Sequence, residues 1–180
     1  MVHDRHSEYL ESKDTFADTM FGFRPHKPAQ DILLQLHHEI LETKEHPHND
    51  KIVLALDLKG AFDNVKHAVI LKHLRETNCG ARTFNYIKHF LTDRLAHIRL
   101  QETEYGPFEM GTRGTPQGAV LFPFLFNIAM KNLPAQLVGV DGVQHALYAD
   151  DIAIWANTGN IAEMEKCLQA AASIVIHYAT

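Results

Sequence analysis

ALYADDIAIW, residues 146–155, is the stretch around which the rest of the chain is organised. An apolar run leads into two adjacent aspartates, Asp150 and Asp151, and a second apolar run leads out of them. The mixture of β-branched, aromatic and small apolar side chains suits a half-buried pleated surface, so the pattern predicts a β-hairpin with the acidic pair at its turn. Asp also tolerates the positive φ that two-residue turns often need. An isolated Asp-Asp pair is usually just a solvated turn, so the rest of the chain must decide its role.

A second carboxylate follows a similar apolar run. KIVLAL, residues 51–56, predicts a short strand that is buried on both faces, and this strand ends at Asp57. If the two strands are neighbours, Asp57 lies close to Asp150 and Asp151. Three carboxylates held together repel one another and are poorly solvated without a cation. Hard divalent ions with oxygen ligands relieve that repulsion, and two of them about 4 Å apart can serve an in-line phosphoryl displacement.

Three separated motifs, standing in this order, resemble the reverse transcriptases of non-LTR (LINE-type) retrotransposons. They are DLKGAFD at 57–63, GTPQGAVL at 114–121 and YADD at 148–151, and GFRP at 22–25 fits the same family. The resemblance covers nearly the whole chain. It implies an α/β fold of the polymerase palm type, with a split antiparallel sheet that carries the aspartates and helices packed on one face.

The same resemblance implies how the chain is divided. Residues 1–180 would form a partial reverse transcriptase domain, in which about 1–50 connect fingers and palm and about 51–180 form the palm. The fingers would be incomplete and the thumb absent. The implied reaction is RNA-directed DNA polymerisation on an RNA template and a DNA primer, with deoxynucleoside triphosphates as substrates and two Mg²⁺ or Mn²⁺ ions as cofactors.

Individual roles also come from the resemblance. Asp57 and Asp150 would bind both metal ions, with Asp151 in support and the carbonyl of Leu58 as a backbone ligand. Phe62 would stack under the sugar and exclude a 2′-hydroxyl. The remaining implied nucleotide-binding residues are Gln117, Gly118 and Tyr148.

Several residues have a second interpretation. Phe62 could instead be a core aromatic side chain. Arg24 could contact template or phosphate, or pair with an acid. Asp63 is expected to cap the helix that follows it rather than bind metal. By the resemblance, Phe122 stands where the family commonly has Ser before proline. We expect that position to be an N-cap and Pro123 to be the first helical residue, so Phe in place of Ser should lower the stability of the helix by about 1 kcal/mol.

The composition suits one domain with a real core: 180 residues, of which 46% are hydrophobic and 22% charged. No run of about 18 apolar residues exists, so no transmembrane helix is predicted. Cys79 and Cys167 match no zinc or redox spacing, which favours reduced thiols inside a cell, in nucleus or cytoplasm. The net charge of -5 argues against a general nucleic-acid binder, although it is compatible with an acidic palm.

Hydrophobic periodicity predicts the remaining elements. Helices are expected over about 28–45, 65–76, 84–91, 123–133 and 161–178, with a hairpin that turns at Tyr105-Gly106-Pro107. Three hypotheses remain open from these residues. The chain is a reverse transcriptase palm, an inactive retroelement remnant that folds and binds only metal or nucleic acid, or an interaction protein that reuses the palm.

Overall fold

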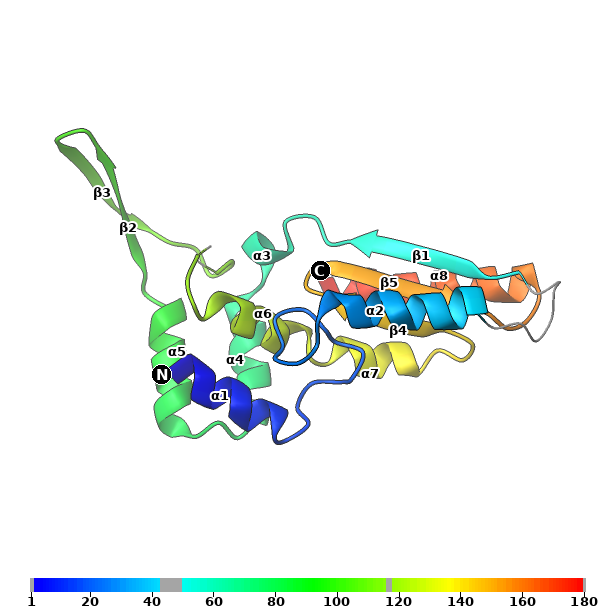
Figure 1. Cartoon of the computed structure of the whole chain (residues 1–180). Helices are drawn as coiled ribbons and strands as arrows, with labels where there is room; N and C mark the ends of the chain where they lie inside the picture. Colours follow the sequence, from blue (N-terminus) through cyan, green and yellow to red (C-terminus); the bar gives the residue numbers. More distant parts are fainter. Residues whose placement is uncertain (1, 43–49, 116–117, 180) are drawn as a thin grey trace. The chain divides into compact units, whose positions relative to one another are not determined.

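The computed structural model describes residues 2–42, 50–115 and 118–179, and it divides into two compact units (Figure 1). The first unit comprises Met1–Ala61 and Met130–Thr180, and the second comprises Phe62–Ala129. Within the described part of the chain, no helix has both the length and the apolar character that a membrane span requires.

The first unit is built on a three-stranded antiparallel sheet in the order β1-β5-β4. β4 (Gln144–Tyr148) and β5 (Asp151–Ala156) form the predicted hairpin, but its two turn residues are Ala149 and Asp150, and Asp151 is already the first residue of β5. β1 (Ile52–Asp57) pairs with β5, so β5 is central and β1 lies at the edge. Because it is an edge strand, β1 alternates between half-buried and exposed residues, and the prediction that both of its faces are buried is wrong.

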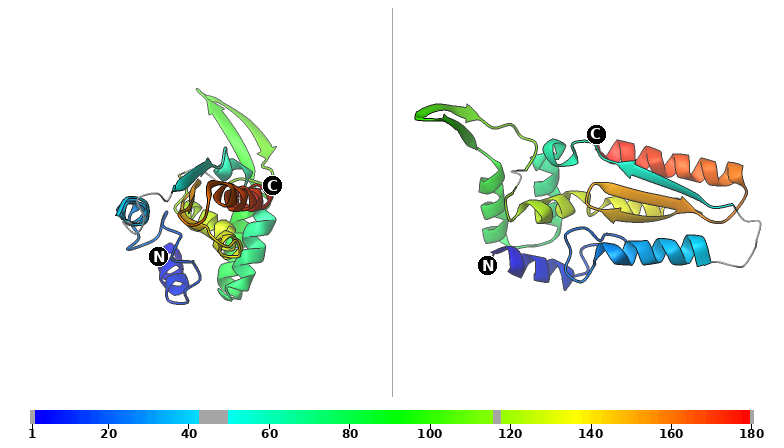
Figure 2. Two further views of the ribbon diagram at one scale, coloured as in Figure 1. Left: turned by 90° about the vertical axis from the view of Figure 1, so that its right-hand side faces the viewer. Right: turned by 45° about the horizontal axis from the view of Figure 1, so that its top comes forward.

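Helices cover both faces of this sheet. On one face, α2 (Ala29–Leu36) continues directly into a π-helix, η1 (His37–Glu42). On the opposite side lie α7 (Leu133–Val138) and the long α8 (Ile161–Ala179), which contact β4 and β5 respectively (Figures 1 and 2). The predicted antiparallel palm sheet is thus present, but the helices are not confined to one face. The unit also contains α1 (Val2–Glu11).

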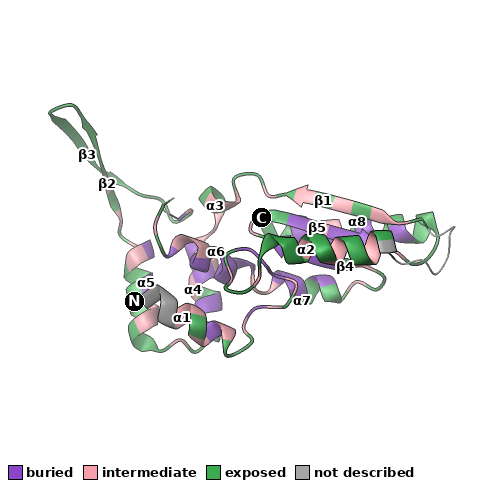
Figure 3. Ribbon diagram, in the orientation of Figure 1, coloured by how far each residue is buried: buried purple, intermediate pink, exposed green. Residues whose placement is uncertain are grey.

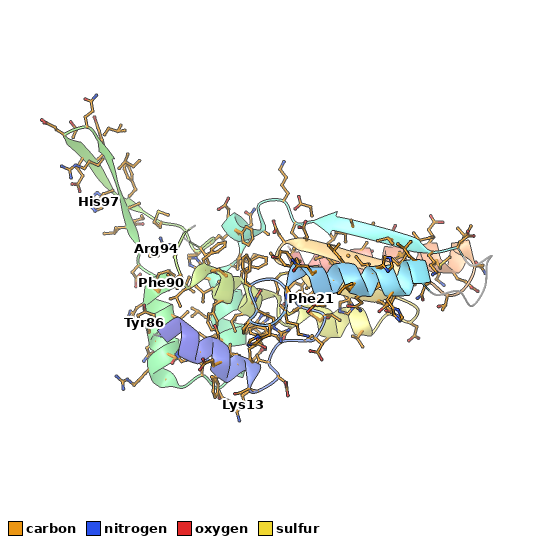
Figure 4. All side chains as sticks on the ribbon, viewed as in Figure 1. Lys13, Phe21, Tyr86, Phe90, Arg94 and His97 are labelled. Carbon is orange, nitrogen blue, oxygen red and sulfur yellow. The ribbon has the colours of Figure 1, made fainter. Side chains whose placement is uncertain are left out.

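The core between α2/η1 and the sheet centres on Trp155, which is fully buried. Phe21 and Ala146 pack with it, and Phe21 is labelled beside α2 in Figure 4. The Trp155 indole donates a hydrogen bond of 2.7 Å to the Glu39 carboxylate, which satisfies its only polar atom. The half-buried apolar residues that complete this core are Ile32, Leu36, Ile40 and Ala153.

The N-terminal ends of α2 and α8 are capped differently. Pro28 occupies the N-cap of α2 and provides no side-chain hydrogen bond there. At α8, Asn160 and Glu163 form a reciprocal capping box: each side chain accepts a hydrogen bond of 3.0 Å from the other's backbone amide. This pair accounts for the sharp start of α8 at Ile161.

The second unit contains three longer helices and an exposed hairpin. Its elements are α3 (Ala61–Asn64, which begins at the unit boundary), α4 (His67–Glu76), α5 (Ala81–Leu91), β2 (Leu95–Leu100), β3 (Thr103–Glu109) and α6 (Phe122–Met130). The buried His73 joins α4 to α6, since its Nδ1–H donates to the Ile128 carbonyl at 3.0 Å.

The hairpin of β2 and β3 is exposed along almost its whole length (Figure 3). At its base the Arg94 guanidinium lies over the ring of Phe90, 6.0 Å from the ring centroid (Figure 4). Its turn lies between Leu100 and Thr103, not at residues 105–107 as predicted. Gly106 instead lies within β3, next to the register irregularity between Ala96 and Ile98.

Candidate active site

Three side chains form a row across one end of the sheet in the first unit. Asp57 at the end of β1 is the direct partner of Asp151 at the start of β5, and Asp151 is also the direct partner of Tyr148 at the end of β4. Directly opposed residues of antiparallel strands present their side chains to the same face. Asp57, Asp151 and Tyr148 therefore share the face on which Trp155 packs against α2/η1, and all three are exposed.

Asp150 lies in the two-residue turn beside this row. Its carbonyl accepts a hydrogen bond of 3.2 Å from the Leu58 amide, which ties the end of β1 to the turn. The Leu58 carbonyl accepts one of 2.9 Å from the Ala61 amide and keeps a second lone pair. The positive φ of this turn, 55°, falls on Ala149 and on neither aspartate, so the predicted backbone reason for the aspartates is wrong.

A hard divalent cation needs several oxygen ligands gathered around one point. Among the residues that the structure describes, no three His, Cys, Asp or Glu side chains are gathered so that they could hold a metal ion. The backbone nevertheless places Asp57 directly opposite Asp151, with Asp150 adjacent, and like charges opposed in this way destabilise a sheet. The three carboxylates are exposed or half-buried, and their oxygen atoms are of the kind that hard divalent cations prefer, so their chemistry suits such an ion although their side chains are not gathered around one point.

A short segment before α2 covers the free edge of β4. Leu147 donates to the Thr19 carbonyl and accepts from the Phe21 amide, both at 2.8 Å, and Met20 forms a parallel bridge with it. Thr19 also places its hydroxyl 3.0 Å from Nε2 of the buried His145. This edge-covering segment, Thr19–Phe21, fixes β4 on the side away from β5.

Gly22 brings this segment against the hairpin turn. A Cβ atom at Gly22 would overlap the backbone nitrogen of Ala149 and would lie 3.1 Å from the carbonyl carbon of Tyr148. The close approach of Gly22 to the hairpin turn is not among the sequence predictions. The signal in the sequence is the glycine of the GFRP motif, because a residue without a Cβ atom permits close backbone approach.

Arg24 is held inside the fold of the first unit. Its guanidinium donates to both carboxylate oxygens of Glu11, at 2.9 and 2.6 Å, and to the carbonyls of Ala17 and Met20, at 2.6 and 2.8 Å. The Arg24 side chain is only 6% exposed. Of its two predicted roles, the structure thus shows the pairing with an acid, and contact with template or phosphate stays a prediction.

The second unit contains the other predicted nucleotide-binding residues. The loop that follows β3 is anchored to the start of α4: His67 donates from its amide to the Thr112 carbonyl and from Nε2 to the Gly114 carbonyl. The Thr115 amide donates to the Phe62 carbonyl at 3.3 Å. Gly118 is exposed with a φ of 84°, whereas Gln117 lies outside the described residues.

Phe62 contacts two other phenylalanines. Its ring centroid lies 4.8 Å from that of Phe122 and 4.6 Å from that of Phe126, with interplanar angles of 50° and 54°. α6 begins at Phe122, one residue earlier than predicted, and the Leu125 amide bonds to the Leu121 carbonyl. Phe122 is therefore inside the first turn and is not the N-cap, so the cost of a lost cap does not apply to it.

Asp63 also differs from its predicted role. It lies within α3 and is exposed, and Lys66 occupies the N-cap of α4, so Asp63 does not cap that helix. A Cβ at Gly114, whose φ is 75°, would lie 2.9 Å from the Asp63 carbonyl oxygen. The glycine that opens the loop therefore allows it to approach α3 closely.

Comparison with known proteins identifies the family. The chain matches the family described as "Reverse transcriptase (RNA-dependent DNA polymerase)" over residues 2–179. The probable RNA-directed DNA polymerase from transposon BS of Drosophila melanogaster is 25% identical over 173 residues, which are 94% of this chain and 19% of that protein. The RNA-directed DNA polymerase from mobile element jockey of the same species is 28% identical over 83% of this chain and 16% of its own length.

These curated relatives are much longer than this chain, which spans less than a fifth of either of them. Among solved structures, apo telomerase from Candida Tropicalis, truncated from its C-terminal domain, has a TM-score of 0.67 at 12% identity, over 99% of this chain and 37% of that chain. That likeness confirms the predicted palm-type α/β fold. The three motifs, the fold and the match along almost the entire sequence show that this chain belongs to the reverse transcriptase family, with relatives among non-LTR retrotransposons.

Proposed function

We propose that this chain is the palm-containing part of an RNA-directed DNA polymerase, which adds deoxynucleotides to the 3′-hydroxyl of a primer on an RNA template. The observation that carries the proposal is the direct opposition of Asp57 and Asp151, with Asp150 in the adjoining turn. If Asp150 and Asp151 belonged only to a solvated turn, nothing would explain why a third carboxylate, distant in sequence, faces them. A site for divalent cations gives that reason.

In this proposal the three aspartates bind the metal ions. Asp57 and Asp150 would hold the two ions, with Asp151 in support and the Leu58 carbonyl as a backbone ligand. Two Mg²⁺ or Mn²⁺ ions, when bound, would activate the primer hydroxyl and neutralise the triphosphate and the leaving pyrophosphate. The protein itself then has to position the substrates and supply charge, and the reaction needs no covalent enzyme intermediate.

The other motif residues hold the substrates. Tyr148 is exposed in the same row as Asp151, and in this proposal it contacts the nucleotide beside the carboxylates. Gln117 and Gly118 border the incoming nucleotide and the template base, and Phe62 excludes the 2′-hydroxyl. Arg24 acts mainly by holding the segment before α2 in place, with template contact as its second role.

The domain assignment is part of the same proposal. Residues 51–180 form the palm and residues 1–50 connect it to the fingers, and the RNA template, DNA primer and deoxynucleoside triphosphates are the ligands. Cys79 and Cys167 are both free thiols, which is consistent with the proposal that the protein acts inside a cell.

The test is primer extension on an RNA template, with purified protein, deoxynucleoside triphosphates and either Mg²⁺ or Mn²⁺. We expect extension by the unsubstituted chain, loss of extension in Asp150→Ala, and no loss in Asp141→Ala, which removes an exposed carboxylate from the loop before β4. Circular dichroism confirms that each variant is folded. Extension that survives Asp150→Ala, or none from the folded unsubstituted chain, would overturn the proposal, and the second result would favour a palm that only binds metal or nucleic acid.

A further inference from the structure

The aromatic contact between Phe62 and Phe122 joins the predicted sugar-contacting residue to the residue that stands directly before Pro123. From the family resemblance, Ser is expected at position 122, where this chain has Phe. A serine at this position could not contact the Phe62 ring as a phenyl ring does. We propose that Phe122 is a positioning residue for Phe62, and that it tightens the selection of deoxynucleotides over ribonucleotides; this rests on the proposed polymerase function.

The first step is the geometry of the three rings. Phe122 and Phe126 are four residues apart in α6, so their side chains lie on the same face of the helix. Phe62 contacts both of them, with centroid distances of 4.8 and 4.6 Å. Both pairs are tilted and fall within the favourable range for aromatic contacts. Phe62 is therefore held by a two-ring clamp on α6, formed by Phe122 and Phe126.

The second step is the difference in burial between the two clamp rings. Phe126 is 1% exposed and belongs to the core of its unit. Phe122 and Phe62 are only half-buried, so they lie where the core meets the surface. A ring at that boundary can change its orientation without disrupting the core. Phe122 is thus the clamp member that can affect Phe62 without the unit losing its fold.

The third step concerns the backbone of Phe62. Its carbonyl accepts the hydrogen bond from the Thr115 amide, in the loop that leads to Gln117 and Gly118. This hydrogen bond ties the Phe62 backbone to the loop, whereas the orientation of the Phe62 ring depends on its side-chain contacts. Removal of the Phe122 ring opens one side of the clamp, so the Phe62 ring samples more orientations and blocks a 2′-hydroxyl less completely.

The size of the effect follows from the contact that is removed. A favourable aromatic pair contributes a free energy equivalent to at most about a tenfold change in an equilibrium. We therefore expect Phe122→Ser to lower the ratio of kcat/KM for deoxynucleotide over ribonucleotide by up to about tenfold. Phe122→Tyr keeps the ring and should retain the original ratio.

The experiment measures this ratio by single-nucleotide primer extension, with competing deoxy- and ribonucleoside triphosphates. The variants are Phe122→Ser, Phe122→Tyr, Phe62→Ala as the reference for lost selection, and Phe108→Ser as the matched control on the exposed hairpin. In parallel, the protein is labelled with 4-fluorophenylalanine and the ¹⁹F resonance of Phe62 is assigned by its disappearance in Phe62→Leu. This second readout does not need enzyme activity.

The expected result is a lower ratio and a displaced Phe62 resonance in Phe122→Ser, with neither change in Phe108→Ser. A Phe62 resonance that stays in place in Phe122→Ser would overturn the clamp. A displaced resonance with an unchanged ratio, while Phe62→Ala lowers the ratio, would overturn the role in selection. If the unsubstituted chain incorporates no nucleotide, the proposed function and the role in selection both fail, and the resonance alone still decides whether the clamp exists.

Discussion

Gly22 and Ala149 are in such close backbone contact that a Cβ atom on Gly22 would overlap the backbone nitrogen of Ala149. This contact joins the edge-covering segment, Thr19–Phe21, to the turn that contains Asp150. Gly22→Ala should therefore move the segment away from β4 or shift the turn. We expect a loss of about 1–3 kcal/mol in the free energy of unfolding, measured by urea denaturation, because overpacking in a closely packed region costs this much.

The matched control is Gly111→Ala, since a Cβ at Gly111 meets no atom within 4 Å and its φ is not in the left-handed region. This variant should unfold at nearly the same urea concentration as the unsubstituted protein. Equal stabilities of the two variants would show that the contact at Ala149 is not a constraint.

The opposition of Asp57 and Asp151 predicts that metal-free protein gains stability when one charge is removed. Asp151→Asn should raise the free energy of unfolding by about 0.2–1 kcal/mol at neutral pH and low salt, since like charges opposed across two strands repel. Addition of Mg²⁺ should stabilise the unsubstituted protein and have less effect on the variant. Thermal unfolding with and without MgCl₂ measures both effects, with Asp141→Asn as the control; a Mg²⁺ effect that is equal in all three proteins would contradict the site.

Arg24 is predicted to be a determinant of stability. Arg24→Ala leaves Glu11 and two carbonyl groups without their charged donor, and the Arg24 side chain is almost fully buried. We expect the free energy of unfolding, measured by urea denaturation, to fall by about 1.5–3 kcal/mol, the range for hydrogen bonds to charged groups. Arg24→Lys should recover only part of it because an ammonium cannot bond both carboxylate oxygens in parallel.

Lys27 offers the comparison for Arg24. It pairs with Asp18 at 2.9 Å, but the Asp18 side chain is 95% exposed. Lys27→Ala should therefore cost under about 1 kcal/mol, as exposed ion pairs do. A loss of the same size in Lys27→Ala and Arg24→Ala would contradict the structural role given to Arg24.

The pH dependence of stability should reflect His145. Burial lowers the pKa of His145 below its ordinary value of about 6.5, so the unfolded chain binds this proton more readily than the folded one. The part of the folding stability that comes from the neutral His145 is fully present above about pH 6.5. It is lost as the pH falls from there through the lowered pKa of the folded state. Urea unfolding between pH 7.5 and 5 should show falling stability in that window.

His145→Gln should flatten this decline, and His89→Gln, which changes an exposed histidine, should leave it unchanged. Burial also lowers the pKa of His6, so part of the decline should remain in His145→Gln. An identical pH profile in His145→Gln and the unsubstituted protein would show that His145 is not a source of the effect.

Local patterns predicted much of the fold. The hairpin around Asp150 and the helix from Ile161 were confirmed because alternation, helical periodicity and the Asn160–Glu163 box are local signals. The burial of β1 was predicted wrongly, because whether an apolar strand is central or at an edge depends on its neighbours and not on its own residues. The turn of the second hairpin was also missed, since Gly106-Pro107 serves as an irregularity within β3.

The candidate site also combines features that the sequence could predict with features that it could not. The three aspartates could be selected from motifs, and the register that opposes Asp57 to Asp151 is consistent with that selection. The contacts of Gly22 with Ala149 and of Phe122 with Phe62 could not be predicted, because they depend on tertiary packing between segments that are distant in sequence. Arg24 is the intermediate case, because two kinds of partner were possible for its guanidinium and no local signal distinguishes between them.

The pairing of β1 with β5 has a consequence for how the chain folds. Asp57 and Asp151 meet only after a loop of roughly 90 residues has closed, whereas β4 and β5 are joined by a two-residue turn. Closure of a long loop is entropically costly and slow compared with hairpin formation. Asp150 and Asp151 should therefore be in place early in folding, and the carboxylate row should be completed late, when the edge strand docks.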